Sequence, residues 1–345
     1  MSRSPVKFKT QVSADKPRLG FLGVGWIGQS RMKSIAESGS AEVFAIADTA
    51  PEIVLQAKEF APDAKVCRSL EELIDSNIDG VVIATPSALH AQQAIAALNS
   101  GKPVFCQKPL GRTATETKAI IDTARLNNCL LAVDLSYRFT DAVQKIRDVI
   151  TNGDLGHIFA INLVFHNAYG PDKAWFYDQQ LSGGGCVIDL GIHLVDMMLW
   201  LLNWPQVTDV TSRLFSNGSP IAPNHTNSVE DYATARIDLD VGITANLACS
   251  WRLPAGCDAV IEASFYGTKG AARFSNVNGS FYDFVAERFR GTTREVLSAP
   301  PDKWGGRAAV DWVRRLATSK NYDSEVESLT TVSATLDAIY GRRQS

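Results

Sequence analysis

The feature that most constrains this chain is a glycine-rich turn between a short apolar strand and a helix. Residues 18–24 predict the strand, Gly23-Val24-Gly25-Trp26-Ile27-Gly28 overlaps its end, and a helical stretch runs on to Ser38. Glycines at this spacing let the backbone approach a pyrophosphate, which then lies at the positive end of the helix. A second apolar strand ends in Asp48, where a carboxylate accepts hydrogen bonds from ribose hydroxyls. Together these features predict a dinucleotide-binding unit, whereas the glycine motif alone would indicate only a tight turn.

Asp48 also indicates which dinucleotide is bound. Its negative charge would repel a 2′-phosphate, and the following Thr49-Ala50-Pro51 supplies no arginine to receive one. We therefore expect NAD rather than NADP.

Apolar strands and helices continue to alternate after this unit. Strands are expected at 64–67, 80–84 and 102–106, with helices at 51–60 and 69–76 and another that ends at Asn99. This alternation predicts a parallel, doubly wound sheet, whose ligands bind beyond the carboxyl ends of the strands. The side chains at such ends are Thr85, Pro86, Gln107 and Lys108.

Length and composition restrict the class of protein. The 345 residues suggest two domains, and fractions of 45% hydrophobic and 21% charged residues indicate an ordinary globular protein. A net charge of −3 gives no attraction to nucleic acid or to an anionic membrane. No apolar run reaches the roughly 18 residues of a membrane-spanning helix, and residues 1–17 lack the hydrophobic centre of a signal peptide. We expect a cytoplasmic protein with a flexible arm at residues 1–17 and neither nucleic-acid nor membrane partners.

The six cysteines are scattered without a Cys-x-x-Cys pair. They are therefore interpreted as reduced core thiols, and neither a zinc site nor a disulfide framework is expected.

The pattern changes in the second half of the chain. After a helix at 140–152 and a strand at 158–166, further strands are expected at 207–215, 232–239, 244–251, 259–266 and 271–275. Turns such as Asp240-Val241-Gly242 favour antiparallel pairing. We predict an α/β protein with a Rossmann domain at 18–138, followed at 139–345 by an α+β domain. That second domain would carry a mainly antiparallel open sheet for substrate binding and oligomer contacts.

A polar stripe interrupts the most apolar segment of the second half. A glycine hinge at 183–185 leads into a helix in which Asp189, His193 and Asp196, spaced at i, i+4 and i+7, share one face. Asp189 could simply cap the helix and His193 could be a core histidine. A metal site would need a third ligand, for which only Asp196 is available, and no metal is expected. A catalytic role requires a reaction, and the dinucleotide-binding unit supplies one, because hydride transfer from an alcohol needs a base near the hydroxyl.

These motifs, in this order, resemble the Gfo/Idh/MocA family of NAD(P)-dependent oxidoreductases. The resemblance covers residues 18 to about 342 and is carried by 23–28, Thr85-Pro86 with His90, Lys108-Pro109, the segment 183–196, Glu230-Asp231-Tyr232-Ala233 and Gly267-Thr268-Lys269-Gly270. It implies an enzyme that transfers a hydride between a nicotinamide cofactor and a secondary alcohol or ketone of a sugar or cyclitol. It also implies that Lys108, Asp189 and His193 are the catalytic residues.

Each of the three has an expected role. His193 would act as general base in oxidation and general acid in reduction. Asp189 would orient the sugar or hold the tautomer of His193. Lys108 would donate a hydrogen bond to the reacting oxygen and stabilise its developing charge.

Two wider sets of residues are expected to line the site. Those expected to bind the cofactor are Gly23, Gly25, Trp26, Ile27, Gly28, Asp48, Thr85, Pro86, His90, Gln107 and Lys108. Candidates for the substrate wall are Arg138, His166, Tyr169, Trp175, Tyr177, Trp251 and Arg252, since binding pockets mix aromatic side chains with a few polar groups. A homodimer or homotetramer is also expected.

Gln107 departs from the family pattern, which usually has Glu-Lys-Pro where this chain has Gln107-Lys108-Pro109. The family glutamate meets the cofactor near its nicotinamide ribose. Losing its negative charge should favour the oxidised, positively charged nicotinamide less. We therefore hypothesise weaker NAD⁺ binding or a shift toward ketone reduction, and we expect Gln107→Glu to change the ratio of NAD⁺ to NADH affinity.

Two other functions are compatible with the same fold. One is glycoside cleavage or elimination through transient oxidation, with a cofactor that is retained and recycled. The other is a sugar-sensing regulator without catalysis, against which the presence of Lys108, Asp189 and His193 together argues.

Overall fold

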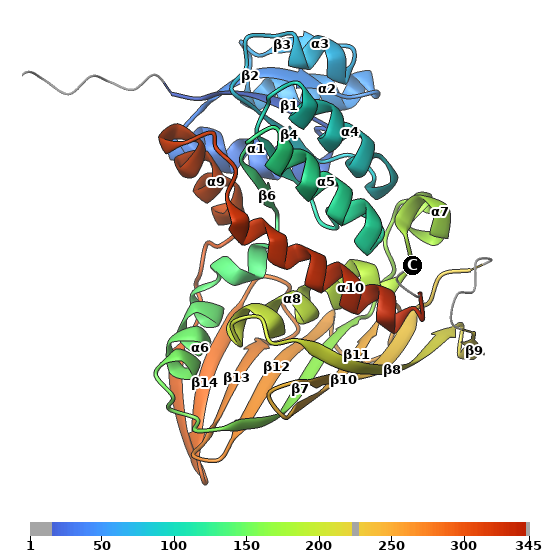
Figure 1. Cartoon of the computed structure of the whole chain (residues 1–345), viewed down its shortest axis with the longest axis vertical. Helices are drawn as coiled ribbons and strands as arrows, with labels where there is room; N and C mark the ends of the chain where they lie inside the picture. Colours follow the sequence, from blue (N-terminus) through green and yellow to red (C-terminus); the bar gives the residue numbers. More distant parts are fainter. Residues whose placement is uncertain (1–15, 223–227, 343–345) are drawn as a thin grey trace, which may run out of the picture.

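The computed structural model describes residues 16–222 and 228–342 and contains two sheets with helices packed between and around them (Figure 1). The first sheet is parallel, with strand order β3-β2-β1-β4-β5-β6. Its strands are β1 (Arg18–Leu22), β2 (Glu42–Ala47), β3 (Lys65–Cys67), β4 (Gly80–Ile83), β5 (Val104–Cys106) and β6 (Leu131–Val133). The order runs outward from β1 on one side and from β4 on the other, so the switch point lies between these two strands. The predicted doubly wound parallel sheet is confirmed.

The crossover helices of this sheet begin at residues suited to helix starts. They are α1 (Trp26–Ser38), α2 (Pro51–Phe60), α3 (Leu70–Ile74), α4 (Ser87–Asn99) and α5 (Ala114–Leu126). Ser69 and Thr113 each accept a hydrogen bond from the backbone N–H three residues later, at 3.2 Å, and so cap α3 and α5. Proline occupies the first position of α2, where its missing N–H costs nothing.

The second sheet has nine strands in the order β15-β14-β13-β12-β7-β11-β10-β8-β9. They are β7 (Ile158–Asn167), β8 (Val207–Ser216), β9 (Ser219–Ile221), β10 (Tyr232–Leu239), β11 (Ile243–Ser250), β12 (Ala259–Gly267), β13 (Ala271–Asn276), β14 (Phe284–Arg290) and β15 (Thr293–Ser298). Among the described strands of this sheet, only β7 and β11 pair in parallel. The mainly antiparallel sheet is thus confirmed, while β9, β14 and β15 were not anticipated.

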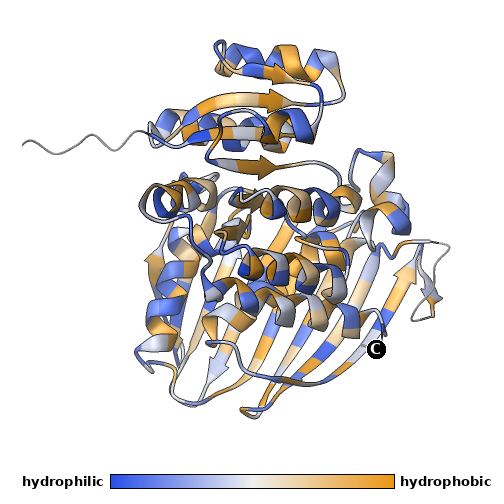
Figure 2. Ribbon diagram, turned by 45° about the horizontal axis from the view of Figure 1, so that its top comes forward, coloured by the Kyte–Doolittle hydropathy of each residue, from blue (hydrophilic) through white to orange (hydrophobic). Residues whose placement is uncertain are grey.

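Helices cover one face of this sheet and leave the other open (Figure 1). The covering helices are α6 (Asp141–Thr151), α8 (Ile192–Leu201) and α10 (Leu329–Ile339). Along the central strands buried residues alternate with more exposed ones, and Figure 2 shows bands of hydrophobic and hydrophilic residues along the same sheet. In β7, for example, Ile161 and Leu163 are buried, whereas Asn162 lies on the open face.

The segment Gln179–Leu201, which contains α7 (Gln179–Ser182) and α8, is the most apolar part of the described chain. Its 23 residues are long and apolar enough to cross a membrane by length and composition alone, which corrects the expectation that no segment reaches that length. However, 89% of its apolar window is buried inside the protein. Core helices of soluble proteins pass the same test, and α8 lies beneath α10 against the second sheet.

The C-terminal part of the chain returns to the first sheet. Helix α9 (Arg307–Thr318) packs beside α1 and places Trp312, which is fully buried, 5.7 Å from the ring of Phe105 on β5. A side chain at Gly80 would come within 2.9 Å of the Trp312 ring, so the glycine makes room for it. Residues after 138 therefore pack on the first sheet, and the predicted division into domains at 18–138 and 139–345 stays a prediction. Of the arm predicted at residues 1–17, residues 1–15 lie outside the part of the chain that the structure describes.

We predict that Trp312→Ala lowers the free energy of unfolding by about 3–5 kcal/mol, because it removes a large, fully buried ring from the core of the first sheet. Urea unfolding followed by circular dichroism measures this. Arg314→Ala, at an exposed position of the same helix, should change it by no more than about 0.5 kcal/mol. Equal effects of the two variants would show that α9 does not anchor the C-terminal segment.

Candidate active site

The three glycines of the first turn have different structural roles. Gly23 has a φ of +80°, and a Cβ there would lie 2.7 Å from the backbone of Ala84. A Cβ on Gly28 would lie 2.2 Å from the carbonyl oxygen of Gly23. At Gly25, by contrast, a Cβ would meet no atom of the described residues within 4 Å. Packing within the protein thus requires the first and third glycines, while the second leaves the backbone open on the side where a pyrophosphate would bind.

The start of α1 and the carboxylate of Asp48 complete this cradle. No side chain caps the start of α1, so its first N–H groups are available to an anion. Asp48 accepts hydrogen bonds from the N–H groups of Val24 at 2.8 Å and Ala50 at 3.0 Å, which hold the glycine turn against β2. Each carboxylate oxygen keeps lone pairs for ribose hydroxyls. The cradle therefore fits a dinucleotide, and Trp26, 75% exposed, stands at its rim.

His90 joins the loops after β4 and β5. Its Nδ1 lies 2.7 Å from the carbonyl oxygen of Pro109 and its Nε2 lies 2.8 Å from that of Thr85. Burial lowers the pKa of His90, while the two carbonyl acceptors oppose this effect. Both ring nitrogens face carbonyl oxygens, and the neutral ring donates to one of them, so His90 links the loop after β4 to the loop that carries Lys108.

Lys108 links the loop after β5 to the segment that carries Asp189. Its Nζ donates to Oδ1 of Asp189 at 2.7 Å and to the main-chain oxygen of Asp189 at 2.8 Å. The other carboxylate oxygen of Asp189 accepts from the indole N–H of Trp251 at 3.1 Å. Because Trp251 is buried, this bond places the indole behind Asp189. Whether Trp251 also contacts substrate stays a prediction.

The helix that carries Asp189 differs from the expected one at its start. Val187–Gly191 forms a π-helical turn, and regular α-helix begins only at Ile192. A π turn widens the helix and commonly lies at functional sites. Asp189 faces Lys108, whereas Asp196 is bound by the guanidinium of Arg138. The two ends of the polar stripe therefore bind different partners, and its shared face stays a prediction.

His193 lies between these two pairs. Its ring packs edge-on against Tyr137 at 4.9 Å, and its Nδ1 is buried without a hydrogen-bond partner among the described residues. Burial, together with the positive charges of Lys108 and Arg31, holds the pKa of His193 well below its ordinary value of 6.5. The imidazole is therefore neutral at neutral pH. No hydrogen bond joins it to Asp189 in the part of the chain that the structure describes.

Arg138 and Asp196 form a buried bidentate ion pair, in which Nε of Arg138 donates to Oδ2 of Asp196 at 2.8 Å and Nη2 donates to Oδ1. Burial raises the pKa of Asp196, and the guanidinium opposes that rise. The guanidinium also lies 5.2 Å from the ring of Trp204. The charge of Arg138 is thus paired with Asp196 in this structure. Contact of Arg138 with substrate stays a prediction.

The remaining wall candidates fall into two groups. Tyr177 donates to the carbonyl of Pro171 at 2.9 Å and accepts from Arg252 at 3.1 Å, and Trp175 lies directly before Phe176, on which its ring stacks at 3.9 Å.

The second group consists of Tyr169 and His166. Tyr169 is exposed and donates to Asp258 at 2.5 Å. His166 contacts Ser250 at 2.8 Å, and its ring stacks on that of Tyr232. For these residues too, contact with substrate stays a prediction.

Glu230 and Tyr340 have roles at the site that sequence reasoning missed. The carboxylate of Glu230, 2% exposed, accepts from the N–H groups of Gly185 at 2.9 Å and Val187 at 2.8 Å and from the hydroxyl of Tyr340 at 2.8 Å. Burial raises its pKa, and these donors oppose the rise. A Cβ on Gly185 would lie 1.9 Å from the carbonyl oxygen of Glu230, which explains the glycine. The motif Glu230-Asp231-Tyr232-Ala233 could have pointed to Glu230, because it was one of the motifs that carried the family resemblance. No motif near Tyr340 pointed to that residue.

A dinucleotide cradle that faces a lysine, an aspartate and a neutral histidine defines a nicotinamide-dependent oxidoreductase. The comparisons agree: residues 18–135 match the oxidoreductase family with NAD-binding Rossmann fold, and residues 143–273 match the Gfo/Idh/MocA C-terminal domain. The chain belongs to the Gfo/Idh/MocA oxidoreductase family, and its first domain is an NAD-binding Rossmann domain.

Similar relatives include a catabolic protein and several dehydrogenases. The chain is 29% identical over 291 residues to the rhizopine catabolism protein MocA of Rhizobium meliloti, covering 82% of this chain and 90% of the relative. It is 25% identical to the myo-inositol 2-dehydrogenase of Thermotoga maritima, covering 81% and 86%. It is 28% identical to the D-glucoside 3-dehydrogenase of Escherichia coli (strain K12), covering 64% and 67%.

Solved structures share the fold. Levoglucosan dehydrogenase in complex with NADH superposes with a TM-score of 0.80 at 22% identity, covering 95% of this chain and 97% of that one. A 3-ketoreductase from Actinomadura kijaniata, solved with NADP, superposes with a TM-score of 0.79 at 18% identity, covering 94% and 97%. Neighbours of this fold therefore bind either nicotinamide cofactor.

We predict that Glu230→Gln lowers the free energy of unfolding by about 1–3 kcal/mol and reduces turnover. The amide has one accepting oxygen, and its NH₂ group would face a backbone N–H or the Tyr340 hydroxyl in a buried site. Urea unfolding and steady-state rates measure the two effects. Glu59→Gln removes the same charge at an exposed position of α2 and should change neither. A Glu230→Gln variant as stable as this control would contradict the role assigned to Glu230.

Proposed function

We propose that this protein transfers a hydride between NAD and a secondary alcohol or ketone of a sugar or cyclitol. The observation that carries the proposal is the neutral imidazole of His193, whose buried Nδ1 has no partner among the described residues and which lies near the Lys108–Asp189 pair. Relatives named as glucoside, inositol and levoglucosan dehydrogenases support a polyhydroxylated substrate.

The side chains divide the work of moving the proton. When bound, the nicotinamide supplies the hydride acceptor or donor. His193, being neutral, removes the hydroxyl proton in oxidation and becomes imidazolium, and in reduction this protonated form gives the proton to the reacting oxygen. Lys108 has three N–H donors, two of which go to Asp189. The third is free to bind the reacting oxygen and stabilise its developing charge.

Asp189 acts chiefly by positioning Lys108. Its two carboxylate oxygens are held by the ammonium of Lys108 and the indole of Trp251. Each oxygen keeps a lone pair with which it can accept from a neighbouring sugar hydroxyl. Asp189 therefore fixes the lysine and contributes to substrate orientation.

We predict that His193→Ala lowers kcat by about 10²- to 10⁴-fold and leaves NADH affinity unchanged, because it removes the proton acceptor but no part of the cradle. The assay is NADH formation and consumption across cyclitols, aldoses, uronates and keto-sugars, with NADH binding followed by fluorescence. His157→Ala, at an exposed position, is the matched control and should be silent.

The pH profile provides a second readout of the same variant. Since the pKa of His193 lies below 6.5, the neutral base persists as the pH falls, and kcat/KM for oxidation should decline only below pH 6.5. That decline should be missing from the residual activity of His193→Ala. Near-normal turnover in the variant, or an unchanged acid limb, would remove His193 from the mechanism.

We also propose a cytoplasmic location. The six cysteines are free thiols, and thiols persist in reducing compartments.

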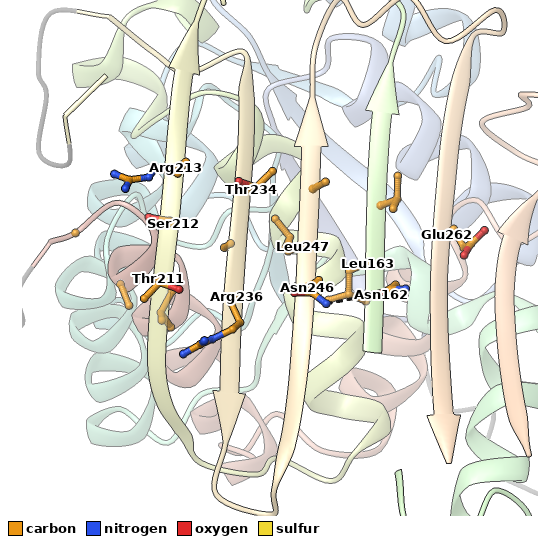
Figure 3. A pocket seen from close by; sticks show the side chains of 16 residues that line it. Asn162, Leu163, Thr211, Ser212, Arg213, Thr234, Arg236, Asn246, Leu247 and Glu262 are labelled. Carbon is orange, nitrogen blue, oxygen red and sulfur yellow. Dashed lines mark hydrogen bonds between the residues drawn. The ribbon is translucent and has the colours of Figure 1, made fainter. Parts of the chain in front are cut away.

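The open face of the second sheet supports a homo-oligomer built on contacts between two copies of this face. It is hollowed by a shallow cavity of about 940 Å³. One row of side chains crosses it in register, namely Arg213, Thr234, Ala248, Val164 and Glu262 on β8, β10, β11, β7 and β12. Figure 3 shows Arg213 and Glu262 on opposite sides of the centre. A two-fold axis through Ala248 would bring each arginine onto the partner's glutamate, which is the self-complementarity that a symmetric dimer requires.

We predict that Ala248→Arg converts the oligomer into monomers, because it places a charged side chain at the proposed axis. Light scattering coupled to size-exclusion chromatography measures the mass of the wild type and the variant. Ala119→Arg, at an exposed position of α5, should leave the mass unchanged. A monomeric wild type, or an Ala248→Arg variant that retains the wild-type mass, would refute this interface.

A further inference from the structure

A buried polar cluster surrounds Asp134, where α1 meets the ends of β5 and β6. Asp134, which follows β6 and is 1% exposed, accepts a hydrogen bond from Nε of Arg31 on α1 at 2.5 Å. It also accepts from the amide nitrogen of Gln107, the residue that follows β5, and from the hydroxyl of Ser136. Arg31 and Gln107 are buried as well, and a second guanidinium nitrogen of Arg31 donates to Ser136 at 3.1 Å. The cluster thus joins three elements that end at the dinucleotide site.

The charge of Asp134 decides how the Gln107 amide is turned. An ionised carboxylate only accepts hydrogen bonds, so the NH₂ group of Gln107 must face Asp134. The amide oxygen is thereby directed away from Asp134. A glutamate at position 107 would have no hydrogen to give to Asp134 and would bring two carboxylates into contact.

We propose that Asp134 is a positioning residue that holds the Gln107 amide with its oxygen toward the ribose beside the nicotinamide, and that its charge is the reason this chain carries glutamine there. The proposal rests on the proposed function and on the expectation that residue 107 lies beside the nicotinamide ribose. The negative charge then lies on Asp134, where Arg31 pairs with it, instead of at position 107, where it would face the cofactor.

This arrangement changes what the Gln107→Glu substitution would measure. In the wild-type background the new carboxylate would meet Asp134, so the variant would report repulsion within the cluster as well as attraction to the oxidised nicotinamide. Exchanging the two groups avoids the repulsion. In Gln107→Glu with Asp134→Asn, the amide at 134 donates to the carboxylate at 107, which reverses the hydrogen bond and moves the charge toward the cleft.

The test is a double-mutant cycle over wild type, Gln107→Glu, Asp134→Asn and the double variant. Melting temperatures are measured without nucleotide, and Kd values for NAD⁺ and NADH are measured by fluorescence titration at one ionic strength. We expect each single variant to melt about 5 °C lower and the double variant to melt higher than the sum of the two losses predicts. We expect the double variant to favour NAD⁺ over NADH about tenfold more than the wild type does.

Gln92→Glu is the matched control, because it makes the same chemical change at an exposed position of α4. It should alter neither the melting temperature nor the ratio of affinities. Additive melting shifts in the cycle would overturn the proposal, since Asp134 would then not hold Gln107. A coupled cycle with an unchanged affinity ratio would overturn its second half, the direction of the amide oxygen. If the wild type bound neither nucleotide, the proposed function would fail, whereas the melting cycle would still decide whether Asp134 holds Gln107.

Discussion

The active site depends first on one buried carboxylate, that of Glu230. It receives two backbone N–H groups at the start of the segment that carries Asp189 and His193, together with the hydroxyl of Tyr340 from the C-terminal helix α10. A carboxylate is buried at a cost that only such donors offset. The triple glycine before the segment is explained by the same contact, since the backbone at Gly185 passes too close to Glu230 for any side chain.

A second set of contacts brings the two halves of the site together. The loop after β5 delivers Lys108 to the π turn that holds Asp189, and the main-chain oxygen of Asp189 is one of the two acceptors of that lysine. Helix α10 packs against both α5 and α8, and α9 inserts Trp312 into the first sheet. The C-terminal segment thus ties the helix that carries His193 to the dinucleotide-binding sheet.

Charge placement connects these parts. Arg31 neutralises Asp134 behind the wall that carries Gln107, and the same arginine helps to lower the pKa of His193. Lys108 adds to that lowering while it binds Asp189. Burial first, and these two cations second, keep the histidine neutral, which is the state that the proposed general base requires.

The sequence alone determined the doubly wound sheet, the glycine turn with Asp48, and the presence of Lys108, Asp189 and His193 at the ends or starts of elements. These are local properties, because strand and helix periods and glycine spacing depend on neighbouring residues. It could not determine that Asp196 pairs with Arg138, that Trp251 binds Asp189, or that Glu230 and Tyr340 hold the segment before Asp189. Those partners lie 58, 62 and 110 residues apart, and only the packing of the two sheets decides which side chains meet. Hydrogen bonds and burial at such distances are set by tertiary structure, which is also why the pKa of His193 and the orientation of Gln107 followed from the fold and not from the motif.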